Sequence, residues 1–226
     1  MVKYERIPFK NRQMPNYTGG EEIFNMVSHI VGGAFGIIAL VLTVVFSALR
    51  GNVWSVVSSS IYGGSMILLY TVSSVYHGLH LNMGKRVMQV IDHCTIFLLI
   101  AGTYTPVVLS AIRPYSAIWG WLLFAVVWGC AALGVTFTAI DMKRYERLAM
   151  VLYLGIGWCI VLAVKPAMAA IPMVGLAWIL AGGIAYTIGA VLYGLGAKHR
   201  YMHSIFHIFV VAGSVLQFFG IFFYVI

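Results

Sequence analysis

The sequence predicts an all-α integral membrane protein with seven transmembrane helices. Apolar residues make up 62% of its 226 residues and charged residues only 9%, whereas soluble proteins average about 45–50% and about 25%. A soluble domain with this composition would lack the polar side chains to cover its surface. The apolar residues also fall into seven long runs, and a helix needs about 20 such residues to cross a bilayer. These observations exclude soluble enzymes, disordered chains and secreted disulfide-rich domains.

The seven predicted spans follow one another with little sequence between them. They are Ile23–Leu49, Val53–Leu81, Val87–Ile112, Ser116–Ile140, Leu148–Val164, Ile171–Gly196 and Tyr201–Ile226. Each break carries a charge or a turn former, and in order the breaks are Arg50–Asn52, Asn82–Arg86, Arg113–Pro114, Asp141–Arg147, Lys165–Pro166 and Lys198–Arg200. Residues 1–20 are predicted to be a short polar tail, and residues 21–226 a single transmembrane domain.

Individual spans carry further signals of how they begin, bend and end. Glu21 and Glu22 precede the first span, where the partial positive charge of a helix N-terminus favours acidic side chains. Pro106 lies inside the third span and is expected to kink it, because proline removes one hydrogen bond of the helix. The fifth span is the shortest, because the pair Lys165-Pro166 is taken as its end.

Lys and Arg are distributed unevenly between the two ends of the predicted spans. Eleven of the fourteen lie in the tail and in every second break, and three lie on the opposite side, namely Arg50, Arg113 and Lys165. Cytoplasmic loops carry the excess of basic residues, so the N-terminus is predicted to be cytoplasmic and the C-terminus outside. Orientation in the membrane thus explains the net charge of +8, and no nucleic acid is expected as a partner.

Several ionisable side chains lie within the spans, where they cost free energy and usually mark a function. Five of them share one depth in the membrane. At about 1.5 Å of rise per residue, they all lie within about 10 Å of the cytoplasmic end: His29, His77, Asp92, His203 and His207. Four helices therefore bring polar groups to one layer, which we interpret as a functional site.

Three of these histidines are spaced to bind one metal ion. His203 and His207 stand about one helical turn apart, so both imidazoles lie on the same face of the seventh span. His77 adds a third nitrogen at matching depth, and Asp92 adds a carboxylate. Three histidines with an open fourth position are typical of catalytic zinc. The alternative is that the histidines link neighbouring helices by hydrogen bonds, which are common in membranes.

The same residues carry a resemblance to a known family. Three separated motifs are similar to the signatures of the progestin and adipoQ receptor superfamily: Glu22-x-x-Asn25-x-x-x-His29, Ser73-x-x-x-His77 followed by Asp92, and His203-x-x-x-His207. The neighbouring sequence resembles its bacterial hemolysin III branch, in particular Glu21-Glu22, Tyr76-His77, Asp92-His93 and Gly102-Thr103-Tyr104-Thr105-Pro106. The resemblance covers about residues 21–226.

The resemblance implies a seven-helix protein of a bacterial plasma membrane with its N-terminus inside. It implies zinc bound by His77, His203 and His207, with Asp92 and Ser73 in contact with the metal-bound water. It further implies hydrolase chemistry on lipid amides, similar to that of ceramidases, and a role in membrane lipid homeostasis. Membrane lipids and a lipid-like substrate or ligand are the expected partners.

The residue types suggest how such a site would act. Zinc held by three neutral imidazoles lowers the pKa of its water to about 7, and Asp92 either accepts the proton of this water or serves as the fourth ligand. Ser73, one helical turn before the first of the three histidines, would orient the water or the aspartate. We expect Glu22, Asn25 and His29 to support the ligands from behind, or to clamp the first span against its neighbours, rather than to bind the metal.

Two other functions fit the sequence. In a receptor or sensor for a lipid or another ligand the zinc is structural, and a closed site with Asp92 as the fourth ligand would favour this function. A pore-forming, hemolytic or transport protein usually places its ionisable groups near the middle of the membrane, whereas the polar layer here is shallow. A zinc-dependent lipid hydrolase is therefore the leading hypothesis.

Overall fold

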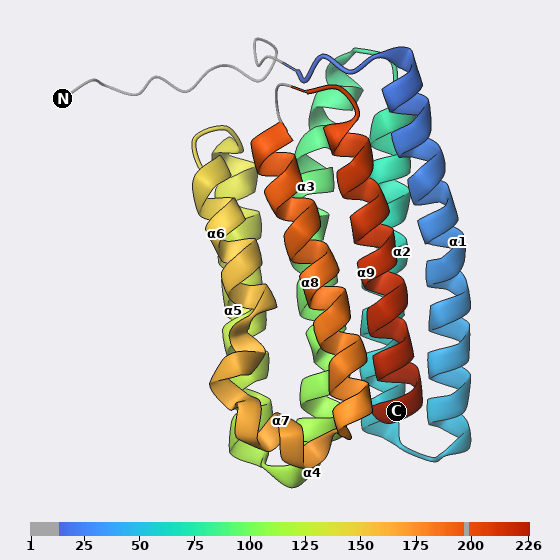
Figure 1. Ribbon diagram of the computed structural model, residues 1–226, viewed down its shortest axis with the longest axis vertical. Coiled ribbons are helices and arrows are strands. Elements are labelled where there is room, and N and C mark those ends of the chain that lie inside the picture. The colour runs from blue at the N-terminus through green and yellow to red at the C-terminus, as the bar shows by residue number, and fades with distance from the viewer. Residues whose placement is uncertain (1–13, 197–198) are drawn as a thin grey trace, which may run out of the picture.

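A computed structural model of the protein describes residues 14–196 and 199–226. Within these residues every regular element is helical, and seven helices are long and apolar enough to cross a membrane. The helices form one bundle, with the start of α1 at one end and the C-terminus at the other (Figure 1). The predicted all-α fold with seven spans is therefore confirmed. Residues 1–13 of the predicted tail and residues 197–198 of the sixth break lie outside the described residues.

Five of the spans are single helices and two are interrupted. The single helices are α1 (Gly19–Leu49), α2 (Val53–Gly78), α5 (Ala117–Asp141), α8 (Met173–Gly196) and α9 (Met202–Tyr224). The third span consists of α3 (Met83–Pro106), the π-helical segment η2 (Val107–Ile112) and the short α4 (Arg113–Tyr115). The fifth consists of α6 (Glu146–Gly157), the 3₁₀ segment η3 (Cys159–Ala163) and α7 (Val164–Ala170).

The fifth span is longer than the sequence predicted. Its expected end was Val164, but helical residues continue to Ala170. Pro166 falls in the first turn of α7, where backbone N–H groups have no partner within the helix and proline is tolerated. The tight turns of η3, rather than the proline, interrupt this span.

The third span changes its geometry at Pro106. This residue ends α3, and the wider π-helical turns of η2 follow directly. Proline cannot donate a backbone hydrogen bond. At the place where the sequence predicted a kink, the structure has a change from α-helical to π-helical turns.

Side chains explain where the helices around the site begin. Asn52 and Asn82 accept backbone N–H groups at the start of α2 and α3. Thr18 and Glu21 form a capping box at the start of α1, in which each side chain accepts from the other residue's backbone. Helix α9 instead follows Tyr201, whose φ of 63° is left-handed. The chain therefore turns sharply just before α9 enters the bundle.

Neighbouring helices pack unevenly around the bundle. Helix α1 packs closely on α2, and α9 packs on both α8 and α1, whereas α6 contacts α8 at few residues. Gly63 permits the close approach of α1 and α2, because a Cβ atom there would lie 2.6 Å from the Cβ atom of Leu40. The functional side chains of α1, α2 and α9 are thus held in the tightly packed part of the bundle.

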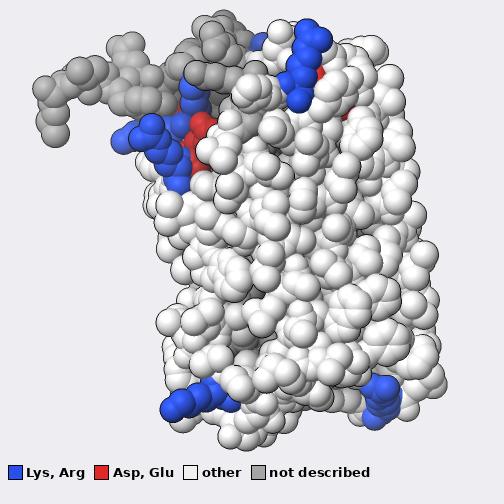
Figure 2. Space-filling model, in the orientation of Figure 1, with Lys and Arg blue, Asp and Glu red and all other residues white. Residues whose placement is uncertain are grey.

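Charged side chains gather at the two ends of the molecule. On the face shown in Figure 2, a broad band without Lys, Arg, Asp or Glu separates the blue and red side chains of one end from the blue side chains of the other. Exposed apolar residues such as Ile38, Val41 and Leu133 contribute to the helix surfaces between the ends. Such a surface suits the hydrocarbon core of a bilayer, which is about 30 Å thick.

Candidate metal centre

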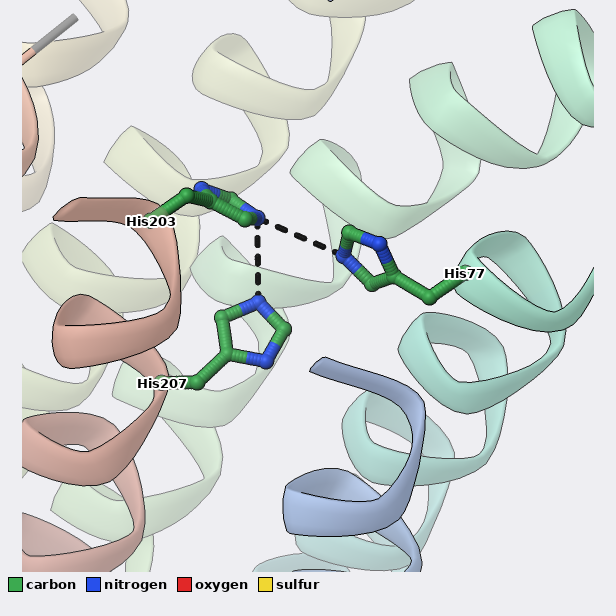
Figure 3. A group of neighbouring side chains, drawn as sticks. All are labelled: His77, His203 and His207. Carbon is green, nitrogen blue, oxygen red and sulfur yellow. Dashed lines mark hydrogen bonds between the residues drawn. The ribbon is translucent and has the colours of Figure 1, made fainter. Parts of the chain in front are cut away.

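Three histidines from two helices meet near the N-terminal end of the bundle. His77 lies in the last turn of α2, and His203 and His207 lie in the first two turns of α9. Their side chains point toward one another (Figure 3). The Nε2 atom of His203 lies 3.3 Å from Nε2 of His77 and 3.0 Å from Nε2 of His207. The structure thus brings together the three histidines that the sequence singled out as ligands.

This arrangement fits a metal ion better than hydrogen bonds among the histidines. The Nε2 atom of His203 carries either one proton or one lone pair, so at most one of its two close contacts can be a hydrogen bond. Two nitrogens bound tetrahedrally to one zinc ion at about 2.0–2.1 Å lie about 3.3 Å apart. One ligand atom from each histidine lies within 4.8 Å of the others. The cluster can therefore bind a metal ion through three nitrogens.

The outer nitrogens of two of these histidines have acceptors behind them. His77 Nδ1 lies 2.6 Å from Glu22 Oε2, and His207 Nδ1 lies 3.3 Å from the backbone oxygen of Asn25. A carboxylate and a carbonyl oxygen only accept, which favours a proton on Nδ1 of both histidines and a lone pair on Nε2 toward the cluster. The Ser28 hydroxyl also lies 3.4 Å from Nδ1 of His207, and it donates to the same carbonyl oxygen of Asn25. Histidine ligands of metals usually have such a partner. Glu22 and Asn25 thus lie where the predicted supporting residues should lie, and their roles stay predictions.

A buried lysine in turn pairs with Glu22. Lys85 Nζ lies 2.7 Å from Glu22 Oε1 and 2.9 Å from the carbonyl oxygen of Leu79, and the residue is only 6% exposed. Lysine is rarely buried unless it is paired. The sequence argument used Lys85 only as a charge that orients the protein. Its contact with Glu22 joins residues 63 positions apart, so spacing gave no sign of it.

His29 lies beside the cluster without joining it. Its ring stacks on His207 with the centroids 3.7 Å apart and the planes at 12°, and it stands edge-on to Tyr70. Neither ring nitrogen has a hydrogen-bond partner, and the same is true of the side-chain amide of Asn25. The structure therefore puts His29 against the ring of a candidate ligand and not among the converging nitrogens.

Ser73 and Asp92 lie next to the three histidines but outside their cluster. Both side chains are buried, and the Ser73 hydroxyl is a hydrogen-bond partner of the Asp92 carboxylate. They line the same cavity as His203 and His207. Among the described residues, the group of mutually close ligand atoms comprises the three histidines and does not include Asp92. Asp92 therefore lies beside the three histidines, whose nitrogens are the ones in this part of the described structure that are close enough together to hold one ion.

A cavity of about 150 Å³ begins at these residues and extends between α3, α6, α8 and α9. Its walls are mainly apolar and include Ile96, Leu99, Ile100, Leu154, Ala190 and Phe206. Trp158 also lines the cavity and is exposed on the outer surface of the bundle. Trp158 thus lies between the cavity and the surface that lipid would cover, near the few contacts of α6 with α8, and its Nε1 donates to the Thr187 hydroxyl of α8.

Tyr17, the residue just before the N-cap of α1, lies over the cluster at the end of the bundle where α1 begins. Tyr17 stacks on His203 with the ring centroids 5.0 Å apart and the planes at 20°, and its ring lies 5.8 Å from that of His77. Burial raises the pKa of Tyr17, and the nearby Tyr193 raises it further, so the phenol is neutral at physiological pH. The sequence argument missed Tyr17, because it assigned residues 1–20 to a polar tail.

A family model for haemolysin-III-related proteins matches residues 17–218, which include every site residue described above. The chain belongs to this family. It is 38% identical over 208 residues to the hemolysin-3 homolog of Bacillus subtilis (strain 168), and the aligned region covers 92% of this chain and 96% of the relative. It is 36% identical over 206 residues to hemolysin-3 of Bacillus cereus, and this alignment covers 91% of this chain and 92% of the relative.

A more distant relative comes from animals. The chain is 26% identical over 226 residues to the human monocyte to macrophage differentiation factor, which covers 96% of this chain and 88% of the relative. Membership of the haemolysin-III-related family confirms the resemblance that the three motifs predicted. Together with the seven apolar helices, it identifies the chain as a multi-pass protein of a bacterial membrane.

Proposed function

We propose that this haemolysin-III-related protein is a zinc-dependent hydrolase of amide or ester bonds in membrane lipids, acting at the cytoplasmic leaflet. One observation carries the proposal: three histidine nitrogens converge, while Asp92 lines an apolar cavity beside them without joining the cluster. Structural zinc sites use four protein ligands, whereas catalytic sites use three and leave one position open. The open side therefore favours a catalytic metal over a structural one.

The donor set favours zinc among the metals of proteins. Imidazole suits zinc, copper, iron and nickel, whereas magnesium and calcium prefer oxygen ligands. The three cysteines, Cys94, Cys130 and Cys159, are not among the mutually close ligand atoms of the described residues. Without a sulfur ligand, soft monovalent copper is disfavoured.

The chain's own residues divide the work at such a site. When bound, zinc supplies a Lewis acid that polarises a carbonyl oxygen and lowers the pKa of water. Asp92 holds its carboxylate beside the cluster and accepts the proton of the attacking water. Ser73 donates a hydrogen bond to Asp92, which orients that carboxylate.

The support behind the ligands keeps the nitrogens aimed at one point. Glu22 accepts a hydrogen bond from Nδ1–H of His77, so this ring cannot rotate without breaking a charge-assisted hydrogen bond. Lys85 balances the charge of Glu22 inside the protein. The backbone of Asn25 has the same effect on His207.

The cavity supports a lipid as the substrate. Its apolar walls would accept hydrocarbon in place of water, and Ser73 and Asp92 line it beside His203 and His207. A lipid that places the first part of its acyl chain in the cavity would present its amide or ester carbonyl to these residues. The weakly packed α6 and α8 offer a way in from the bilayer.

Metal analysis of the detergent-purified protein by mass spectrometry is the first test. We expect about one zinc per chain in the wild type, a complete loss in His203→Ala, and retention in Asp92→Ala. His80→Ala is the matched control, because this histidine is exposed. Loss from both His203→Ala and Asp92→Ala would make Asp92 a ligand and favour a receptor or sensor with structural zinc. A wild type that takes up no zinc would contradict the proposal.

Hydrolysis is tested separately on the zinc-loaded protein. The protein is incubated with a mixture of membrane lipid amides and esters, and released fatty acids are measured by mass spectrometry. We expect release by the wild type and by Ser74→Ala, whose hydroxyl bonds to the backbone of Tyr70, and none by Asp92→Ala. A fully loaded wild type that releases no fatty acid would overturn the hydrolase and leave a ligand-binding function.

A further inference from the structure

The aromatic ring that covers the histidine cluster is that of Tyr17, in the segment that precedes α1. Tyr17 lies outside α1, yet its side chain stacks flat on His203, the central member of the cluster. The outward nitrogen of His203, Nδ1, is buried and has no hydrogen-bond partner. Tyr193 and Phe206 also pack against this ring, at centroid distances of 5.5 and 5.7 Å. Tyr17 shields the ring together with them and contributes no ligand.

Glu21 fastens this segment to the start of α9. Its Oε2 atom accepts from the backbone N–H and the hydroxyl of Thr18, each at 2.8 Å. Its Oε1 atom accepts from the backbone N–H of Tyr201 at 2.6 Å. The side chain is almost fully buried, at 4% exposed. One carboxylate therefore joins the residue next to Tyr17 with the residue two positions before His203.

The geometry of Tyr201 makes this fastening specific. Tyr201 has a left-handed backbone, which costs free energy in a residue other than glycine, and its N–H is turned toward Glu21. The hydroxyl of Tyr201 lies over Gly20, where a Cβ atom would approach it to 3.2 Å. The first turn of α1 and the turn before α9 are thus in contact through Glu21 and Gly20.

We propose that Tyr17 is a hinged cover over the three-histidine site and that Glu21 is the latch that keeps it closed. The cover separates the site from water at the end of the bundle where α1 begins, while the cavity extends from the site toward α6 and α8. Breaking the hydrogen bond of Glu21 to Tyr201 frees the segment before α1 and uncovers His203. Water and metal enter and leave by this route, whereas lipid uses the cavity. The proposal refines the site of the proposed function, but its first test needs no metal.

The first test measures the reactivity of the histidines in the metal-stripped full-length protein. Diethyl pyrocarbonate modifies accessible imidazoles, and mass spectrometry reads the modification at each histidine. We expect His203 to react about three- to tenfold faster in Tyr17→Ala than in the wild type, the range expected when an aromatic contact of about 0.5–1.5 kcal/mol is lost. His80, which is exposed, is the internal reference and reacts at one rate in all variants.

Three further variants separate the cover from a general loosening of the fold. Tyr17→Phe keeps the ring and should restore the slow reaction of His203. Glu21→Ala keeps the tyrosine at position 17 but removes the latch, so the cover opens and the reaction should accelerate as in Tyr17→Ala. Tyr145→Ala, which removes a ring packed at a tilt against Phe137, should leave the reaction of His203 unchanged. Equal reaction rates of His203 in the wild type, Tyr17→Ala and Glu21→Ala would overturn the proposal.

The second test measures the release of zinc from the loaded protein to a chelator. We expect release to be about three- to tenfold faster in Tyr17→Ala and Glu21→Ala, and unchanged in Tyr17→Phe, for the same loss of an aromatic contact. If no variant retains zinc while the reactivity of His203 follows the expected order, the cover stands and the zinc hydrolase fails. If zinc is retained but both release and reactivity ignore Tyr17 and Glu21, the zinc site stands and the cover fails.

Discussion

Two clusters of buried polar side chains lie within the bundle, and they differ in how their atoms are satisfied. Halfway along α9, the hydroxyls of Tyr70 and Tyr186 each lie 2.7 Å from Oγ of Ser214. The Tyr70 hydroxyl also lies 3.3 Å from the carbonyl oxygen of Val210. Since a hydroxyl both donates and accepts, this cluster can complete its hydrogen bonds with that carbonyl. At the start of α9, by contrast, the Nε2 atom of His203 has two nitrogen neighbours and at most one hydrogen bond between them.

The difference separates a structural cluster from a binding cluster. Buried polar groups cost free energy unless they are paired, and the three hydroxyls are paired with one another and with the carbonyl oxygen of Val210. The three imidazoles cannot all be paired in this way, since Nε2 of His203 forms at most one hydrogen bond to its two neighbours, whereas one cation would satisfy all three nitrogens. The half-buried carboxylate of Glu22 and the buried Lys85 behind it belong to the second kind of cluster. A set of variants in both clusters tests this distinction.

The largest effect is expected from His207→Ala compared with Tyr186→Phe. Removing one of three nitrogens should reduce the zinc content from about one per chain to below about 0.1, because the affinity of such sites depends on every ligand. Removing the hydroxyl of Tyr186 should leave the zinc content unchanged. Metal analysis of the purified proteins checks both. Equal zinc in the two variants would remove the distinction between the clusters.

The next effect concerns turnover and not binding. Asp92→Asn should keep its zinc but lose lipid hydrolysis by about 10²–10⁴-fold, the usual contribution of a general base. Rates of fatty-acid release at equal zinc content measure this loss. Glu146→Gln, at an exposed position of α6, is the matched control. An Asp92→Asn protein that hydrolyses lipids normally would exclude Asp92 as the base.

A smaller effect is expected from the support of His77. Glu22→Gln should weaken zinc affinity by about 10–100-fold, the usual cost of losing the partner of a ligand. It also leaves Lys85 buried without its carboxylate, so some loss of thermal stability should accompany it. Competition with a chelator of known affinity measures the first change. Zinc affinity equal to that of the wild type would show that Glu22 supports only the fold.

The smallest effect on the zinc content is expected from Ser214→Ala, which should instead lower the stability of the fold. This change leaves the hydroxyls of Tyr70 and Tyr186 without their shared partner and should cost about 1–3 kcal/mol of unfolding free energy. The zinc content should stay the same. Unfolding in mixed detergent micelles measures the stability of the variant beside the wild type. A loss of zinc without a loss of stability would contradict the structural role of this cluster.

Much of the fold followed from the sequence because the bilayer sets strict rules. Seven apolar runs became seven spans. The predicted breaks Arg113–Pro114 and Lys165–Pro166 were wrong, because these residues lie within the short helices α4 and α7. The fifth span was too short in the prediction, because Lys165-Pro166 was read as a break. Its proline falls in a first helical turn, a place where proline is tolerated, and the apolar pattern alone does not show where a turn begins.

The candidate site was predictable in part for a similar reason. His77, His203 and His207 share a depth that can be counted along each helix, and the structure brings them together. The pairing of Glu22 with Lys85 was not predictable, since Lys85 lies in the second predicted break and its side chain reaches back into the protein. Tyr17 was missed as well. The Thr18-x-x-Glu21 pattern of a capping box was the one signal that the end of the tail is ordered.

The sequence by itself determined the membrane class, the number of spans and the depth of each polar side chain, because these depend on composition and on distance along one helix. The tertiary structure alone decided which side chains at that depth face one another. It turned three Nε2 atoms together, left Asp92 beside them and laid Tyr17 across His203. These facts depend on the rotation of each helix and on its neighbours, which are set by packing over the whole bundle.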